Sequence, residues 1–185
     1  MMRSGLFSLL FLLGILAADD TGAQTSEAPP DIVTNWEDLL PPGLYDFMPK
    51  TLMSYEDYMK PEFQEKLIAA DRKIRPVLDS KPIILPGYMV PLEYKGTDVY
   101  VFLLVPNAGQ CIHVPPPPVN QTVYVALEKP TRMRTYGEPV IVEGIVLTKG
   151  AVTEYAETGY RINASEVIDF DIDVLEERII NAGGE

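Results

Sequence analysis

Apolar positions follow a helical spacing in the first half of the chain and strand-like runs in the second half. Between residues 61 and 75 the apolar side chains recur every three or four positions, at Phe63, Leu67, Ala70 and Ile74. This spacing places them on one face of an amphipathic helix. Pro61 suits the first turn of that helix, where its missing N–H costs nothing, and Pro76 is expected to end it. Residues 35–42 begin at a good N-cap and stop at two prolines, so they predict about one helical turn.

The second half has the pattern of a small β domain. Strand-length runs rich in β-branched and aromatic residues occupy residues 82–94, 98–105, 121–127, 139–147 and 160–170. The first two runs are separated by a short turn and should pair as a hairpin. Short strands at close spacing after a helix predict a mainly β fold, a small antiparallel barrel of the oligonucleotide- and oligosaccharide-binding (OB) type.

Single residues add detail to this prediction. Gly87 and Gly144 fall inside strand runs, where glycine is typical of a bulge or a sharp bend. Residues 173–176 resemble a capping box and Gly183 resembles a helix stop, so a short helix is expected to close the chain. Trp36 is expected to be an apolar plug at the edge of the domain.

The first residues have the pattern of a secretory signal peptide. A short basic start precedes an apolar run over residues 5–16, and small residues follow up to Ala23. A membrane-spanning helix needs roughly 20 apolar residues, and this run is shorter. We therefore expect cleavage after Ala23 or Ala18, and a mature chain without a membrane span in the periplasm or outside the cell.

Four regions follow from these patterns. They are a signal peptide over residues 1–23, a disordered linker over 24–34, a helical N-terminal segment packing on the barrel over 35–79, and the β-barrel domain over 80–185.

Charge and cysteine content narrow the possible functions. The chain has 15 Lys and Arg against 27 Asp and Glu, a formal net charge of −12 that would repel a phosphate backbone. Nucleic acid is therefore not expected as a partner. The sole cysteine, Cys111, cannot form an internal disulfide in an oxidising compartment, so it should be buried, bound to a ligand or used between chains.

Cys111 and His113 are candidate metal ligands. On an extended strand, side chains two residues apart share a face, about 6.6 Å apart along the strand. Sulfur with nitrogen suits zinc or copper better than calcium or magnesium. A zinc site takes three or four protein ligands, and His113 is the only histidine. The other donors would come from carboxylates such as Glu93 or Glu143, from amides, or from another copy of the chain.

Two other interpretations of this pair stay open. Cys111 can be a small buried hydrophobe beside a hydrogen-bonded His113. In a thiol-dependent enzyme, the imidazole would instead activate the thiolate as a nucleophile. Two positions on one strand suit such a catalytic pair less well, and no catalytic residue is assigned.

A polyproline segment follows, formed by Pro115, Pro116, Pro117 and Pro118. It should adopt a stiff, exposed polyproline II conformation. It can serve as a rigid ledge for a partner, or as a spacer that holds Asn120 and Gln121 beside the Cys-His strand as second-shell or partner contacts. These alternatives stay open.

Several stretches resemble a bacterial exported family catalogued as domain of unknown function 3299. They are residues 85–92, 102–106, 111–121 and 142–144, and the resemblance covers about residues 36–170. The Cys-Ile-His-x-Pro-Pro-Pro-Pro-x-Asn-Gln string is its most specific part. The family's members look like periplasmic proteins or lipoproteins, some encoded near exporter-type permeases and zinc-responsive genes. This chain lacks the lipoprotein cysteine, so a lipid tether is not expected.

The resemblance implies a non-enzymatic periplasmic accessory protein of a transport or metal-homeostasis system. Its ligand would be zinc or copper held by Cys111 and His113, and its partner an envelope transporter or permease. The alternative is a metal-free envelope protein-interaction module that uses the polyproline segment and a groove of the barrel.

Overall fold

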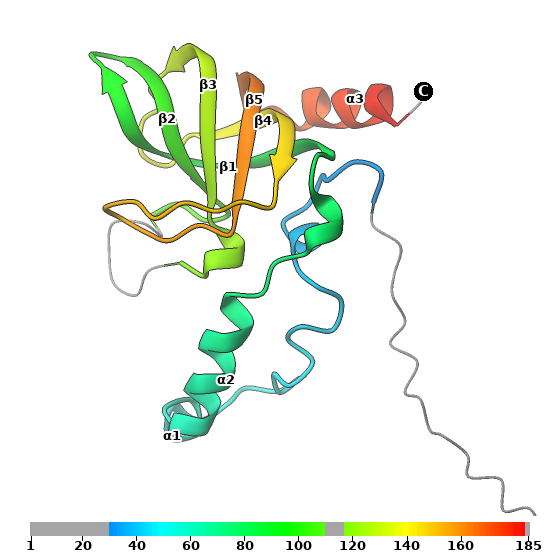
Figure 1. Ribbon diagram of the computed structural model, residues 1–185, viewed down its shortest axis with the longest axis vertical. Helices are drawn as coiled ribbons and strands as arrows, with labels where there is room; N and C mark the ends of the chain where they lie inside the picture. Colours follow the sequence, from blue (N-terminus) through cyan, green and yellow to red (C-terminus); the bar gives the residue numbers. More distant parts are fainter. Residues whose placement is uncertain (1–29, 110–116, 184–185) are drawn as a thin grey trace, which may run out of the picture.

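Five strands form a closed barrel in the computed structural model, which describes residues 30–109 and 117–183 (Figure 1). Around the barrel the strands follow the order β1-β2-β3-β5-β4, which is the closure expected of an OB-type barrel. Their bounds are Pro82–Lys95 for β1, Asp98–Val105 for β2, Val123–Arg132 for β3, Pro139–Leu147 for β4 and Tyr160–Asp169 for β5. The predicted mainly β barrel is confirmed.

One pair of strands departs from the antiparallel pattern. β1 with β2, β2 with β3, β1 with β4 and β4 with β5 are antiparallel, whereas β3 and β5 run parallel. β5 returns to β3 only after the chain has passed through β4, which lies between β5 and β1 in the barrel. This crossover gives β5 the same direction as β3.

The barrel interior is apolar because alternate residues of each strand point inward. Trp36 packs against this core, and its indole Nε1–H donates a 2.8 Å hydrogen bond to the carbonyl of Pro86 in β1. Trp36 therefore holds the N-terminal segment on the barrel, as expected of an apolar side chain at the domain edge. Val33 is also fully buried and bridges to Ile83, so the disordered linker predicted up to residue 34 is wrong at Val33. Fully buried core side chains include Leu85, Phe102, Val125, Val142 and Ile162.

Figure 1 shows the helices α1 and α2 projecting away from the barrel as an arm. α1 spans Tyr55–Tyr58 and α2 spans Pro61–Asp71. The helix predicted up to residue 75 ends earlier, because the Lys73 N–H turns back to the carbonyl of Ala70 at 2.9 Å. Short 3₁₀ turns cover Glu37–Leu39 (η1), Pro76–Leu78 (η2) and Val119–Gln121 (η3).

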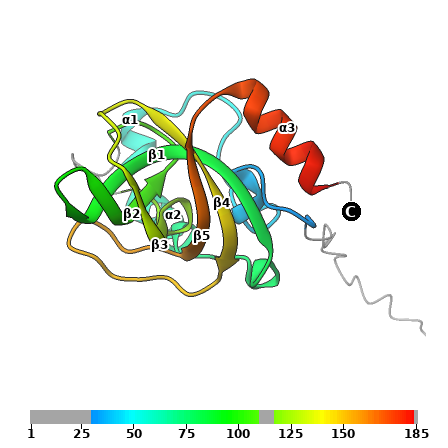
Figure 2. The same ribbon diagram turned by 90° about the horizontal axis from the view of Figure 1, so that it is seen from above.

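The C-terminal helix α3, Ile172–Ala182, lies along the outside of the barrel (Figure 2). Its Leu175 packs with Ile84 of β1 and Ile141 of β4 in a second, small apolar cluster. The N-cap is Asp171, whose carboxylate accepts from the N–H groups of Asp173 and Val174, so the predicted capping box at residue 173 is wrong by two positions. The helix was predicted to stop at Gly183, and this residue is its C-cap.

The two strand glycines have different roles. At Gly144 the pairing of β4 with β5 shifts register, and a Cβ built there would lie 2.3 Å from the carbonyl oxygen of Asn163. The predicted bulge is therefore present at this position. Gly87 has no register shift, but a Cβ there would lie 2.9 Å from both the Leu104 side chain and the Val105 carbonyl oxygen. Glycine at 87 permits β1 to approach β2 closely.

The predicted signal peptide lies outside the described residues and stays a prediction. Within residues 30–109 and 117–183, no helix is both long and apolar enough to cross a membrane.

Candidate functional site

The candidate metal ligands Cys111 and His113 lie outside the described residues, as do Pro115 and Pro116. The structure shows where the connection that carries them begins and ends. β2 ends at Val105, β3 begins at Val123, and Val123 pairs with Leu104 across the β2–β3 ladder. The connection therefore leaves the barrel and returns to it at neighbouring positions on one end.

The returning part of this connection is fixed by Asn120, which is fully buried. Its amide donates hydrogen bonds to the carbonyl oxygens of Ala70 at 3.0 Å and Lys73 at 3.1 Å, at the end of α2. Because its side chain is fully buried, Asn120 does not face an external partner. Its second-shell role stays a prediction, since Cys111 and His113 lie outside the described residues. In the described structure Asn120 joins the helical arm to the barrel.

Gln121 also serves the fold. Its amide donates to the carbonyl oxygen of Trp36 at 3.1 Å and to that of Asn120 at 3.3 Å. The predicted use of Gln121 as a second-shell or partner contact stays a prediction, because Cys111 and His113 lie outside the described residues. Both amides hold distant parts of the chain together.

A polar network surrounds Asn120. The Tyr45 hydroxyl donates a 2.8 Å hydrogen bond to Asp71 and lies within 3.5 Å of the Asn120 amide group. Burial raises the pKa of Tyr45 to about 12 and also raises the pKa of the Asp71 carboxyl. The Tyr45 hydroxyl therefore stays protonated at neutral pH and can keep donating to Asp71.

The described half of the polyproline segment does not form an exposed ledge. Pro117 is buried and Pro118 is partly buried, and the Pro118 carbonyl accepts from the Thr122 hydroxyl at 2.9 Å. The prediction of an exposed segment is thus wrong at Pro117. Packing against the folded chain at this point fixes the end of the connection.

Glu93 and Glu143, the predicted carboxylate donors, lie far apart. Glu93 pairs with Val101 near the β1–β2 turn, whereas Glu143 pairs with Ile84 at the other end of β1. Nine residues of β1 separate these pairing positions, about 30 Å along the strand. They cannot both complete one metal site.

Glu143 is also engaged elsewhere. Its carboxylate lies 3.2 Å from the guanidinium of Arg178 in α3, which also binds Glu166 at 3.0 Å. This ion pair ties α3 to the barrel. Within the described ranges, no three His, Cys, Asp or Glu side chains gather in a way that could hold a metal ion.

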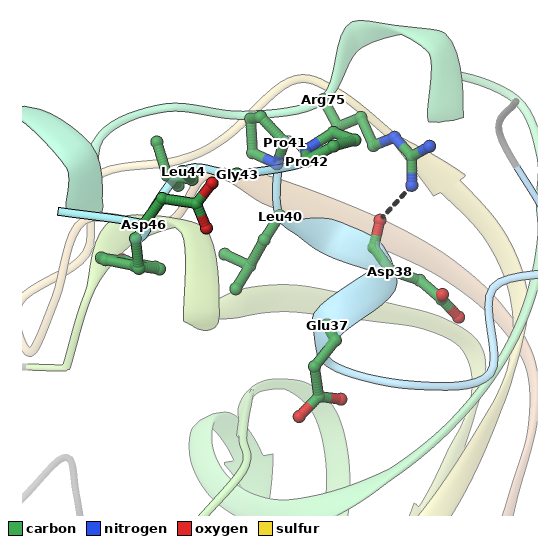
Figure 3. A pocket seen from close by; sticks show the side chains of 10 residues that line it. Glu37, Asp38, Leu40, Pro41, Pro42, Gly43, Leu44, Asp46 and Arg75 are labelled. Carbon is green, nitrogen blue, oxygen red and sulfur yellow. Dashed lines mark hydrogen bonds between the residues drawn. The ribbon is translucent and has the colours of Figure 1, made fainter. Parts of the chain in front are cut away.

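An open pocket of about 380 Å³ lies between residues 37–46 and Arg75 (Figure 3). Arg75 borders it and donates to the Asp38 carbonyl at 3.2 Å, while the Asp38 carboxylate accepts from the backbone N–H of Thr34 and of Asn35. Figure 3 shows the carboxylates of Glu37, Asp38 and Asp46 pointing in different directions. The pocket is polar but does not bring these acids together.

A larger hollow of about 600 Å³ opens on the barrel wall between β3 and β5. The two strands pair from Val123 with Tyr160 to Leu127 with Ala164, and both continue beyond that point without pairing to each other. This opening was not predicted from the sequence. Pro130 in β3 could have indicated it, because proline cannot donate a ladder hydrogen bond and is typical of strand edges and bulges. The hollow is lined by Ala126, Leu127, Glu128, Lys129, Asn163, Ala164 and Ser165.

Comparison with known proteins identifies the family. The family described as "Protein of unknown function (DUF3299)" matches residues 36–169. This chain belongs to the DUF3299 family. The crystal structure of a DUF3299 family protein from Pseudomonas aeruginosa PAO1 is 37% identical, with a TM-score of 0.57, and the match covers 78% of this chain and 98% of that chain. The resemblance drawn from the sequence is thereby confirmed.

The DUF3299 match begins at Trp36 and ends at the last residue of β5, so it includes the arm and the whole barrel. A structure of an OBody bound to hen egg-white lysozyme also matches, with 18% identity and a TM-score of 0.34 over 55% of this chain and 92% of that chain, and supports no inference. No curated protein matches this chain.

Proposed function

We propose that this DUF3299 protein is an exported, non-enzymatic accessory protein of a transport or metal-homeostasis system, and that it binds zinc or copper through Cys111 and His113. One observation supports the proposal more than any other. The connection that carries both residues is anchored at neighbouring positions on one end of a closed barrel. Binding residues are often carried by loops that a rigid scaffold positions.

Anchoring the ends of this connection favours metal binding, because a loop that must become ordered on binding loses conformational entropy, and this loss weakens the affinity. On the returning side, Pro117 is buried and the Val119 carbonyl accepts from the Gly159 N–H at 2.7 Å. Asn120 and Gln121 add the side-chain hydrogen bonds described above. In general, fixing the end of a loop lowers the conformational entropy that is lost when the side chains of the loop bind an ion.

A second copy of the chain is the source of further donors that we favour. Glu93 and Glu143 cannot serve together, and the Asn120 side chain is fully buried against the end of α2. Two chains that each supply Cys111 and His113 would give a four-ligand site of two sulfurs and two nitrogens. Such a set is common for zinc.

Metal content tests this proposal. The mature protein, purified without chelator and exposed to zinc, is expected to bind one ion for two chains and to form a dimer that dissociates on chelation. A variant with Cys111→Ala and His113→Ala should bind no zinc above background and stay monomeric. Glu176→Gln is the matched control and should behave like the wild type, because Glu176 is an exposed residue of α3. Equal zinc content in the wild type and the double variant would contradict the proposal.

The accessory role has its own test in a bacterial host. A strain without this protein is expected to grow more slowly when zinc is limited by a chelator, and the wild-type chain should restore growth. The double variant at Cys111 and His113 should not. If the double variant restored growth fully, the role of the protein in this strain would not depend on metal binding by Cys111 and His113.

A metal-free interaction module is a second candidate function, and the hollow between β3 and β5 supports it. Two strands that diverge leave main-chain groups available to a ligand. The polyproline part of this candidate has less support, since Pro117 is buried.

A further inference from the structure

Arg161 of β5 lies on the outer face of the barrel beside Tyr124 of β3. Its neighbours Tyr160 and Ile162 are fully buried in the core, so by strand alternation Arg161 points outward. Arg161 and Tyr124 are partners in the parallel ladder, and the guanidinium carbon lies 4.9 Å from the centre of the Tyr124 ring. This is a cation–π contact that fixes the plane of the guanidinium.

The charge of Arg161 is not matched by a carboxylate. In the described part of the chain Arg161 makes no ion pair, although Arg72, Arg132, Arg134 and Arg178 each do. Its Nε–H is shielded from solvent and has no hydrogen-bond acceptor there. A shielded donor without an acceptor is costly and calls for an explanation, such as a ligand. The unpaired positive charge of this partly buried guanidinium would attract an external anion.

The same face leads from Arg161 into the hollow. Asn163 and Ala126 are the next outward residues of β5 and β3, they are ladder partners, and both line the hollow of about 600 Å³. Ala126 is small and leaves space above the sheet. Arg161 and Ser165 are four residues apart, or about 13 Å along the strand, which matches the length of an extended tetrapeptide.

The walls of the hollow favour a peptide over other anions. Beyond Leu127 and Ala164 the backbones of β3 and β5 no longer pair with each other, so at Glu128 and Ser165 the open edges can hydrogen-bond the far end of a peptide that begins at Arg161. A guanidinium offers a planar set of donors that fits a carboxylate. We propose that Arg161, stacked on Tyr124, binds a carboxylate of an extended peptide whose backbone lies in the hollow between β3 and β5. This rests on the second candidate function and names its ligand.

Nuclear magnetic resonance of the mature protein tests the proposal. The probe is the peptide acetyl-Thr-Val-Thr-Val with a free C-terminal carboxylate, compared with the same peptide carrying a C-terminal amide. The carboxylate peptide is expected to shift the Nε–H signal of Arg161 and the backbone amide signals of Asn163 and Ser165, saturating at millimolar concentration. The amidated peptide should bind about tenfold more weakly, because it lacks the charge-assisted contact.

Three variants locate the contact. Arg161→Gln is expected to bind both peptides equally weakly, and Arg161→Lys to recover only part of the preference, because lysine lacks the planar donors. Arg72→Gln is the matched control, since Arg72 is an exposed arginine paired with Glu157, and it should bind like the wild type. The amide spectrum of each variant shows whether it is folded.

The outcomes distinguish the two levels of the proposal. Equal binding of both peptides to the wild type, with no effect of Arg161→Gln, would overturn the carboxylate contact and leave the hollow as a peptide site. No shift with either peptide at millimolar concentration would overturn both the contact and the peptide-binding hollow.

Discussion

Replacing Asn120 by alanine tests how the helical arm is joined to the barrel. The Asn120 side chain is fully buried, and its amide donates to the carbonyl oxygens of Ala70 and Lys73 at the end of α2. Alanine cannot make either hydrogen bond and leaves a small cavity. The change also removes the group next to the Tyr45 hydroxyl.

The expected loss follows from these contacts. Each hydrogen bond contributes about 1 kcal/mol, and a buried carbonyl left without its donor costs about 1 to 3 kcal/mol. Ala70 keeps another donor, the Lys73 N–H, so only the Lys73 carbonyl loses its described side-chain donor. Together with the cavity, we expect Asn120→Ala to lower the free energy of unfolding by about 2 to 4 kcal/mol.

Urea unfolding of the mature chain, followed by circular dichroism, measures this change. Asn163→Ala is the matched control, because Asn163 is exposed and its replacement should alter the free energy of unfolding by less than about 0.5 kcal/mol. If Asn120→Ala is as stable as this control, Asn120 does not join the arm to the barrel.

Three further predictions concern other parts of the chain. Gly144→Ala is expected to lower the melting temperature and to cost about 1 to 3 kcal/mol, because the new Cβ would meet the Asn163 carbonyl oxygen at the bulge; a melting temperature equal to the wild type would refute the assigned close approach. Asp71→Asn should be as stable as the wild type or more stable at pH 7. Burial raises the folded-state pKa of Asp71, so the wild type loses stability as pH rises through that pKa, and asparagine removes this loss. A clear destabilisation at pH 7 but not at acidic pH would show that the ionised carboxylate is needed. Export from a bacterial host should yield a mature chain that begins at Gln24 or Asp19, read by N-terminal sequencing, and an uncleaved Met1 in the secreted fraction would contradict the signal peptide.

Local patterns in the sequence were sufficient for most of the barrel. The bounds of β2 and β4 agree with the predicted runs because their apolar residues lie between turn signals. β3 was expected to end at Leu127, but it continues to Arg132. Glu128, Lys129 and Pro130 have the composition of a break, and their extended conformation depends on the barrel around them.

Features that depend on distant neighbours could not be predicted. The parallel pairing of β3 with β5 depends on the crossover through β4, which no local pattern specifies. Asn120 was predicted to be a second-shell or partner contact, and its hydrogen bonds to Ala70 and Lys73 were not foreseen because these residues are about fifty positions away along the chain. The contact of Arg161 with the Tyr124 ring could not be predicted either, because it depends on the pairing of β5 with β3.

Cys111 and His113 are proposed to bind a metal ion, and X-ray absorption of the zinc-loaded protein tests this binding most directly. We predict sulfur scatterers at about 2.3 Å and nitrogen scatterers at about 2.0 Å from zinc, in equal numbers if two chains share the ion. The sulfur shell should disappear in Cys111→Ala. A shell of oxygen and nitrogen only, unchanged by that substitution, would contradict the claim.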